Sequence, residues 1–61
     1  MKLYEVELAD PDSRPGVVWE RLNIGASTLA HAASKARVRS RVRNHSIPLE
    51  VRKVEYKGEL V

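Results

Sequence analysis

The chain has 61 residues, of which 43% are hydrophobic and 31% charged, so its composition is that of one small globular domain over residues 1–61. It contains no cysteine, which excludes disulfides and thiolate metal sites, and no apolar run approaches the roughly 18 residues of a membrane span. The net charge is +3, and we expect a cytoplasmic protein that does not bind membranes. So short a chain has a thin core, and self-association as a homodimer would stabilise it.

Residues 2–8 alternate between apolar and other side chains, which is the period of a half-buried strand. Tyr4, Val6 and Leu8 fall on one side, so this side is predicted to face the core. Residues 9–16 contain Asp, Pro, Ser and Gly, which all favour turns, and a loop is predicted there.

Residues 17–24 are rich in β-branched and aromatic side chains and are predicted to form a second strand, antiparallel to the first. Leu22 and Ile24 share one side of this strand, and Val17 and Trp19 lie on the other. Two interpretations stay open. Either Val17 and Trp19 are interface residues on a sheet face that no helix covers, or the alternation is inverted and Trp19 belongs to the core.

A helix is predicted to begin at Ser27, a good N-cap, after the strand breaks at Gly25 and Ala26. Mostly small residues recur at spacings of three and four, which would let the helix lie close to a sheet. The stripe consists of Leu29, Ala32, Ala33, Ala36 and Ser40.

Val38 and Val42 do not fit this stripe, because they project from nearly the opposite side of the helix. An alternative is that the helix stops near Arg37 and residues 38–43 form a short strand. Arginine and alanine favour a helix, and the next turn former is Asn44, so we prefer a helix that runs to about Arg43.

Residues 47–56 are predicted to form the last strand, which ends at Lys57 and Gly58. Val51 and Val54 have different parity, so a bulge is expected near Arg52 and Lys53. The fold class is therefore α+β with the order β-β-α-β: a three-stranded, mainly antiparallel sheet with one helix packed on one face. A right-handed crossover places the first strand in the centre of the sheet.

The strongest functional signal is a stretch from Arg21 to Leu49 without any Asp or Glu. On the predicted helix, Arg37 and Arg41 lie on one flank and Arg39 and Arg43 on the other. The macrodipole accounts for one or two cations near a helix end, and strand acids could neutralise others. The six cations of this stretch are Arg21, Lys35, Arg37, Arg39, Arg41 and Arg43.

We interpret these cations as phosphate contacts of a small non-enzymatic nucleic-acid-binding or regulatory protein, with Arg21 in support. DNA and RNA are not distinguished, because no helix-turn-helix, zinc-finger or RNP motif is present. The alternative is a protein-interaction module or inhibitor that docks an acidic partner protein, or a homo-oligomeric assembly subunit that uses Val17 and Trp19. No catalytic, cofactor or metal site is predicted, since His31 and His45 have no other ligand at a suitable spacing.

Overall fold

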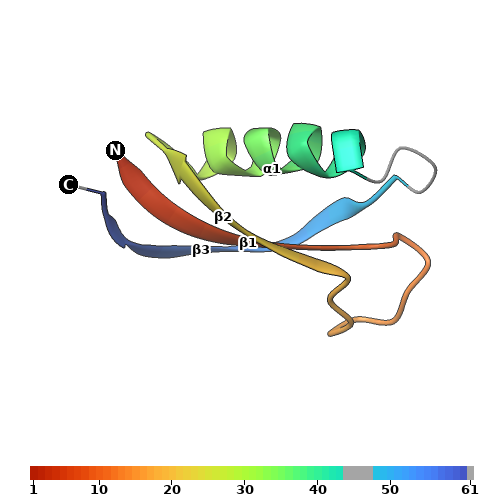
Figure 1. Ribbon diagram of the computed structural model, residues 1–61. Coiled ribbons are helices and arrows are strands. Elements are labelled where there is room, and N and C mark those ends of the chain that lie inside the picture. The colour runs from red at the N-terminus through yellow and green to blue at the C-terminus, as the bar shows by residue number, and fades with distance from the viewer. Residues whose placement is uncertain (44–47, 61) are drawn as a thin grey trace.

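The computed structural model describes residues 1–43 and 48–60. Strands β1 (Lys2–Ala9) and β2 (Glu20–Ala26) are followed by helix α1 (Leu29–Arg43) and strand β3 (Glu50–Glu59). The predicted order β-β-α-β is confirmed, and the helix lies along one face of the sheet (Figure 1). The expected helix exit at Asn44 and strand start at Ile47 lie outside the described residues. Within the described part of the chain, no helix has the length and apolar character needed to cross a membrane.

The sheet has the order β2-β1-β3, with β1 antiparallel to both neighbours, so the predicted central position of the first strand is confirmed. Glu7 pairs with Lys53 and Leu8 with Val51, which leaves Arg52 as the extra residue of a bulge. This bulge was predicted from the change of parity, and its effect is that Val51 and Val54 both pack against the core.

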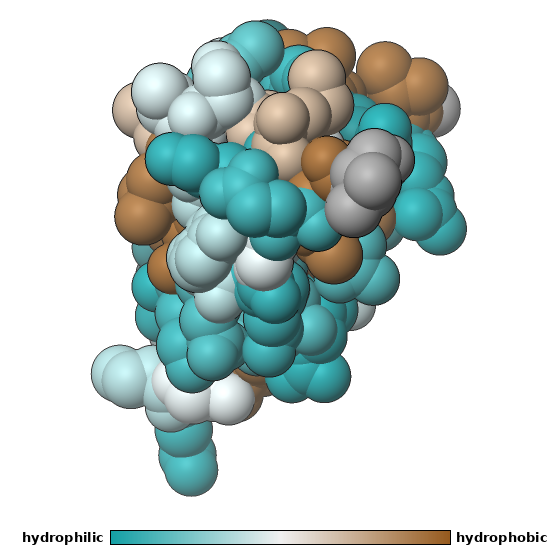
Figure 2. Space-filling view, turned by 90° about the vertical axis from the view of Figure 1, so that its left-hand side faces the viewer, coloured by the Kyte–Doolittle hydropathy of each residue, from teal (hydrophilic) through white to brown (hydrophobic). Residues whose placement is uncertain are grey.

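The core lies between the sheet and the helix. The alternating residues of β1 are buried as predicted, and the helix contributes only small side chains, which allow it to lie close to the strands. The core cluster consists of Tyr4, Val6, Leu8, Leu22, Ile24, Ala26, Ala32 and Ala36. Figure 2 views the molecule from the end at which the chain starts; hydrophobic surface lies mainly in its upper half, and the lower half is mostly hydrophilic.

The helix extends to Arg43, so the alternative of a short strand over residues 38–43 is wrong. Its N-cap is Thr28 and not Ser27: the Thr28 hydroxyl accepts a hydrogen bond from the His31 amide at 3.1 Å. Leu29 was expected in the buried stripe but is 52% exposed. Only Ser27 and Thr28 separate β2 from the helix, and the first helix residue to be buried is Ala32.

The strand limits differ from those predicted. β2 begins at Glu20, so Val17 and Trp19 belong to the loop before it, and it continues through Gly25 to Ala26. β3 likewise continues through Lys57 and Gly58. Gly25 and Gly58 disfavour strands locally, but both stay in the sheet because β1 offers backbone hydrogen-bond partners as far as Lys2.

Arg52 holds the loop between β1 and β2. Its Nη2 donates hydrogen bonds to the carbonyl oxygens of Asp10 at 2.9 Å, Ser13 at 3.1 Å and Pro11 at 3.3 Å. The loop lies on the side of the sheet away from the helix (Figure 1). The bulge therefore also serves to aim one guanidinium group at the loop backbone.

Candidate nucleic-acid interface

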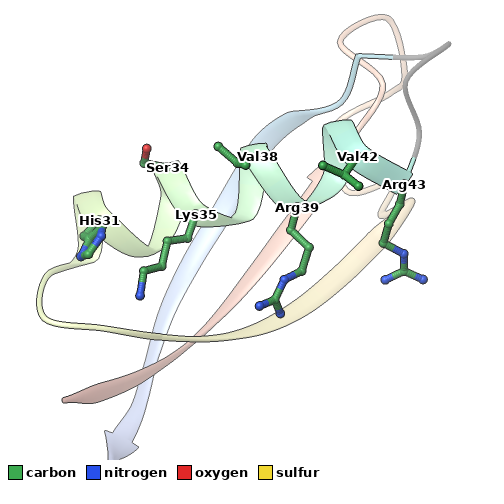
Figure 3. Close-up of a pocket in the computed structure, with 7 residues that line it drawn as sticks. All are labelled: His31, Ser34, Lys35, Val38, Arg39, Val42 and Arg43. Carbon is green, nitrogen blue, oxygen red and sulfur yellow. The ribbon is translucent and has the colours of Figure 1, made fainter.

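Three cations of the helix, Lys35, Arg39 and Arg43, follow each other at intervals of four residues and form a row that we call the β2-side row. Lys35 Nζ donates to the carbonyl oxygen of Gly25 in β2 at 2.8 Å. Arg43 Nη1 lies 3.3 Å from Glu20 Oε2, also in β2. Figure 3 shows all three side chains pointing to the same side of the helix.

Arg37 and Arg41 form a second row on the opposite flank, which we call the β3-side row because β3 is the other edge of the sheet. Both residues are exposed, and so is Arg39 of the first row. Among the residues that the structure describes, none of these three guanidinium groups is paired with a carboxylate. Like charges at i,i+4 repel, so the helix carries these arginines at a small cost in stability.

The strand acids are engaged elsewhere, which explains why these arginines stay unpaired. Alternation along β1 directs Glu5 and Glu7 to the face that the helix does not cover, which we call the uncovered face. Glu50, at the start of β3, lies 3.2 Å from Arg52 Nε. Among the residues that the structure describes, the interpretation that strand acids neutralise the helix cations therefore holds for Arg43 alone. By register, the uncovered face comprises Glu5, Glu7, Arg21, Asn23, Lys53 and Glu55.

Arg21 does not join the other five predicted cations. It lies on the uncovered face, where its Nη2 is 3.0 Å from Glu7 Oε2 and its Nε is 3.9 Å from Glu5 Oε1. On β3, the other edge strand, Lys53 and Lys57 lie 3.8 Å and 3.5 Å from Glu55 Oε2. The linear sequence placed Arg21 with the helix cations, but the strand alternation turns it to the other side of the sheet.

The outermost line of the helix carries no charge. Val38 is 61% exposed and Val42 72% exposed, and His31 and Ser34 continue the same line toward the N-terminal end. We call these four residues the crest. The sequence pattern already indicated this exposed line, because both valines lie opposite the stripe of small residues, and residues opposite a buried stripe face solvent. A shallow hollow beside the crest is lined by His31, Ser34, Lys35, Val38, Arg39, Val42 and Arg43 (Figure 3).

Val17 and Trp19, the predicted interface residues, are both exposed, and Trp19 is 51% exposed. The interpretation of Trp19 as a core residue is wrong. The amide of Trp19 donates to the carbonyl oxygen of Leu8 at 2.9 Å, which anchors this end of the loop to the sheet. The pair lies beside β2 and not on the strand itself, and the homodimer suggested for it stays a prediction.

The described residues include no cluster of three or more His, Asp or Glu side chains that could hold a metal ion, and His45 lies outside them. The Tyr56 hydroxyl donates a hydrogen bond to Glu59 Oε1 at 3.0 Å, and this hydrogen bond raises the pKa of Tyr56 above its usual value. This pair belongs to β3 and not to the cation rows.

No protein-family model matches the chain, and comparisons with curated proteins and with solved structures likewise give no match.

Proposed function

We propose that this protein is a non-enzymatic nucleic-acid-binding protein that contacts phosphates through the two cation rows of α1. The observation that carries the proposal is that Arg37, Arg39 and Arg41 are exposed and have no carboxylate partner among the described residues, on a helix without any acidic residue. Arg21 is left out of the contact set because it is paired on the opposite face.

The chemistry of the guanidinium group supports phosphate as the target. Its planar donors match two oxygens of one phosphate, and each phosphate that is neutralised releases condensed counterions. The helix has 15 residues and is therefore about 22 Å long, so it can follow several phosphates along a backbone. Among the described residues, no aromatic side chain lies on the helix beside these arginines to stack on bases, since Trp19, Tyr4 and Tyr56 lie on the strands and the loop.

The test is the binding of fluorescent oligonucleotides, measured by anisotropy from 50 to 300 mM salt. About four neutralised phosphates give a slope of log K against log salt of roughly −3.6 on a duplex. The variant Arg37→Gln/Arg41→Gln should reduce the size of this slope by about 1.8. The matched control Arg14→Gln/Lys53→Gln removes the same charge from the loop and the uncovered face and should leave the slope unchanged. Absence of binding to both DNA and RNA at 50 mM salt would refute the proposal.

A second candidate function is the capture of a partner protein through the loop before β2. It is favoured by one observation, the exposure of Trp19 next to Val17, since tryptophan is enriched in binding hot spots. Here Trp19→Ala should change oligomeric state or partner capture and leave nucleic-acid binding intact. Size-exclusion chromatography with light scattering, with and without an oligonucleotide, separates the two candidates.

A further inference from the structure

The helix face has a shape and a charge pattern that together define its partner more closely. The crest stands on the outside of a helix that rises from the sheet, so the surface is a ridge (Figures 1 and 3). Lys35 and Arg39 border it on one flank, and Arg37 and Arg41 on the other. A complementary partner is concave, carries negative charge along both walls, and presents an uncharged floor to Val38 and Val42.

A second copy of this chain does not fit that description. Packing two such helices together would bring the two cation rows of one molecule against the same rows of the other, with no acid on either helix to compensate. An acidic amphipathic helix docks into a single groove, and here it would lie in the shallow hollow on the β2 side of the crest. It would leave Arg37 and Arg41 on the other flank without acidic partners.

The major groove of B-form DNA does fit. It is about 12 Å wide and 8.5 Å deep, it admits an α-helix, and phosphates line both of its walls. Its floor exposes the C5 methyl groups of thymine, which make apolar contacts, and hydrogen-bonding groups that histidine and serine side chains can address. The buried residues of α1 are Ala32, Ala36 and Ser40, whereas the crest and both cation rows are exposed and therefore accessible for insertion.

We propose that α1 enters the major groove of duplex DNA, with the crest facing the base edges and the two cation rows gripping the phosphates of opposite walls. This inference rests on the proposed function and deepens it, because it selects B-form duplex DNA over RNA and single strands. A-form RNA has a deep, narrow major groove that a helix cannot enter, so duplex RNA is a sensitive counter-probe.

The first experiment compares three probes of one sequence in the same buffer, namely duplex DNA, duplex RNA and single-stranded DNA, and adds polyglutamate as a competitor. The expected result is that duplex DNA binds at least about tenfold more tightly than duplex RNA or the single strand, and that polyglutamate competes poorly. Equal binding of the nucleic acids would overturn groove insertion and leave the proposed function standing. Failure of every nucleic acid to bind would remove both, and preferential binding of polyglutamate would point to an acidic protein.

The second experiment tests the crest with an A·T-rich duplex in which thymine is replaced by uracil, which removes only the methyl groups from the floor of the groove. The wild-type protein should prefer the thymine duplex by about three- to fourfold for each methyl group that a valine buries. Val38→Ala/Val42→Ala should lose this preference with an unchanged salt slope, and equal affinity of the wild type for both duplexes would contradict the proposal. Leu29→Ala, which removes an exposed apolar side chain from the same helix away from the crest, is the matched control.

Discussion

The two faces of this molecule both carry several cations, but they use them differently. On the uncovered face, Arg21 lies 3.0 Å from Glu7, and Lys53 lies 3.8 Å from Glu55. On the helix face, Arg43 pairs with Glu20, whereas Arg37, Arg39 and Arg41 have no carboxylate partner among the described residues. Exposed ion pairs add little to stability, roughly 0 to 1 kcal/mol each, but they neutralise the field around them. The capacity to attract a polyanion thus depends on which cations lack neighbouring acids and not on how many there are.

Reversal of charge in the β3-side row should have the largest effect. Arg37→Glu/Arg41→Glu replaces two attractions for phosphate by two repulsions, and we expect affinity for duplex DNA to fall on the order of a hundredfold at 100 mM salt. The same reversal on β3, Lys53→Glu/Lys57→Glu, changes the net charge equally at two lysines beside Glu55 and should alter affinity much less. Anisotropy titrations of both variants measure the difference. If the two variants lost equal affinity, net charge and not the placement of the arginines would control binding.

The next largest effect is expected from a substitution that forces the helix away from the sheet. Ala36→Leu overpacks the contact between α1 and the strands and should lower the free energy of unfolding by about 1–3 kcal/mol. The same substitution at the exposed Ala30 adds equal volume to the same helix and should change stability by less than about 0.5 kcal/mol. Urea denaturation followed by circular dichroism gives both values. Equal destabilisation by the two variants would mean that the alanine stripe does not set the distance between helix and sheet.

Introducing an acid into the helix would make this face resemble the uncovered one. Ser34→Glu places a carboxylate three residues before Arg37, where it can form an ion pair that stabilises an isolated helix by about 0.2–0.5 kcal/mol. We expect affinity for DNA to fall several-fold and the size of the salt slope to fall by about one unit, since one phosphate contact is lost. The control is Ser34→Gln, because glutamine has the shape of the introduced glutamate without its charge. This variant should keep the wild-type slope.

The smallest expected effect comes from releasing Arg43 from its ion pair with Glu20. Glu20→Gln removes the charge that neutralises Arg43 while preserving the shape of a side chain that is largely buried on the helix side of β2. Arg43 then becomes available to phosphate, and the salt slope should steepen by about 0.9. Glu50→Gln releases Arg52 instead, which remains bonded to the loop backbone, and should leave the slope unchanged. A slope that stays constant in Glu20→Gln would show that Arg43 cannot reach the ligand.

The sequence by itself determined the order of the elements, the central strand, the bulge at Arg52 and the acid-free helix. These features depend on side-chain alternation, on helical spacing and on the residue types within a short segment, all of which are local. The same local pattern marked Val38 and Val42 as misfits, although it did not show that they form the crest between two rows of cations.

Only the tertiary structure decided which cations are neutralised and where the strands end. Arg21 meets Glu7, and Arg43 meets Glu20, because strand register and the packing of the helix bring distant residues together. Gly25 and Gly58 stay in the sheet because β1 supplies backbone partners that outweigh their local preference for turns. Pairing between segments far apart in the chain leaves no trace in local residue patterns, and for that reason neither the Arg21 ion pair nor the full length of β3 could be predicted.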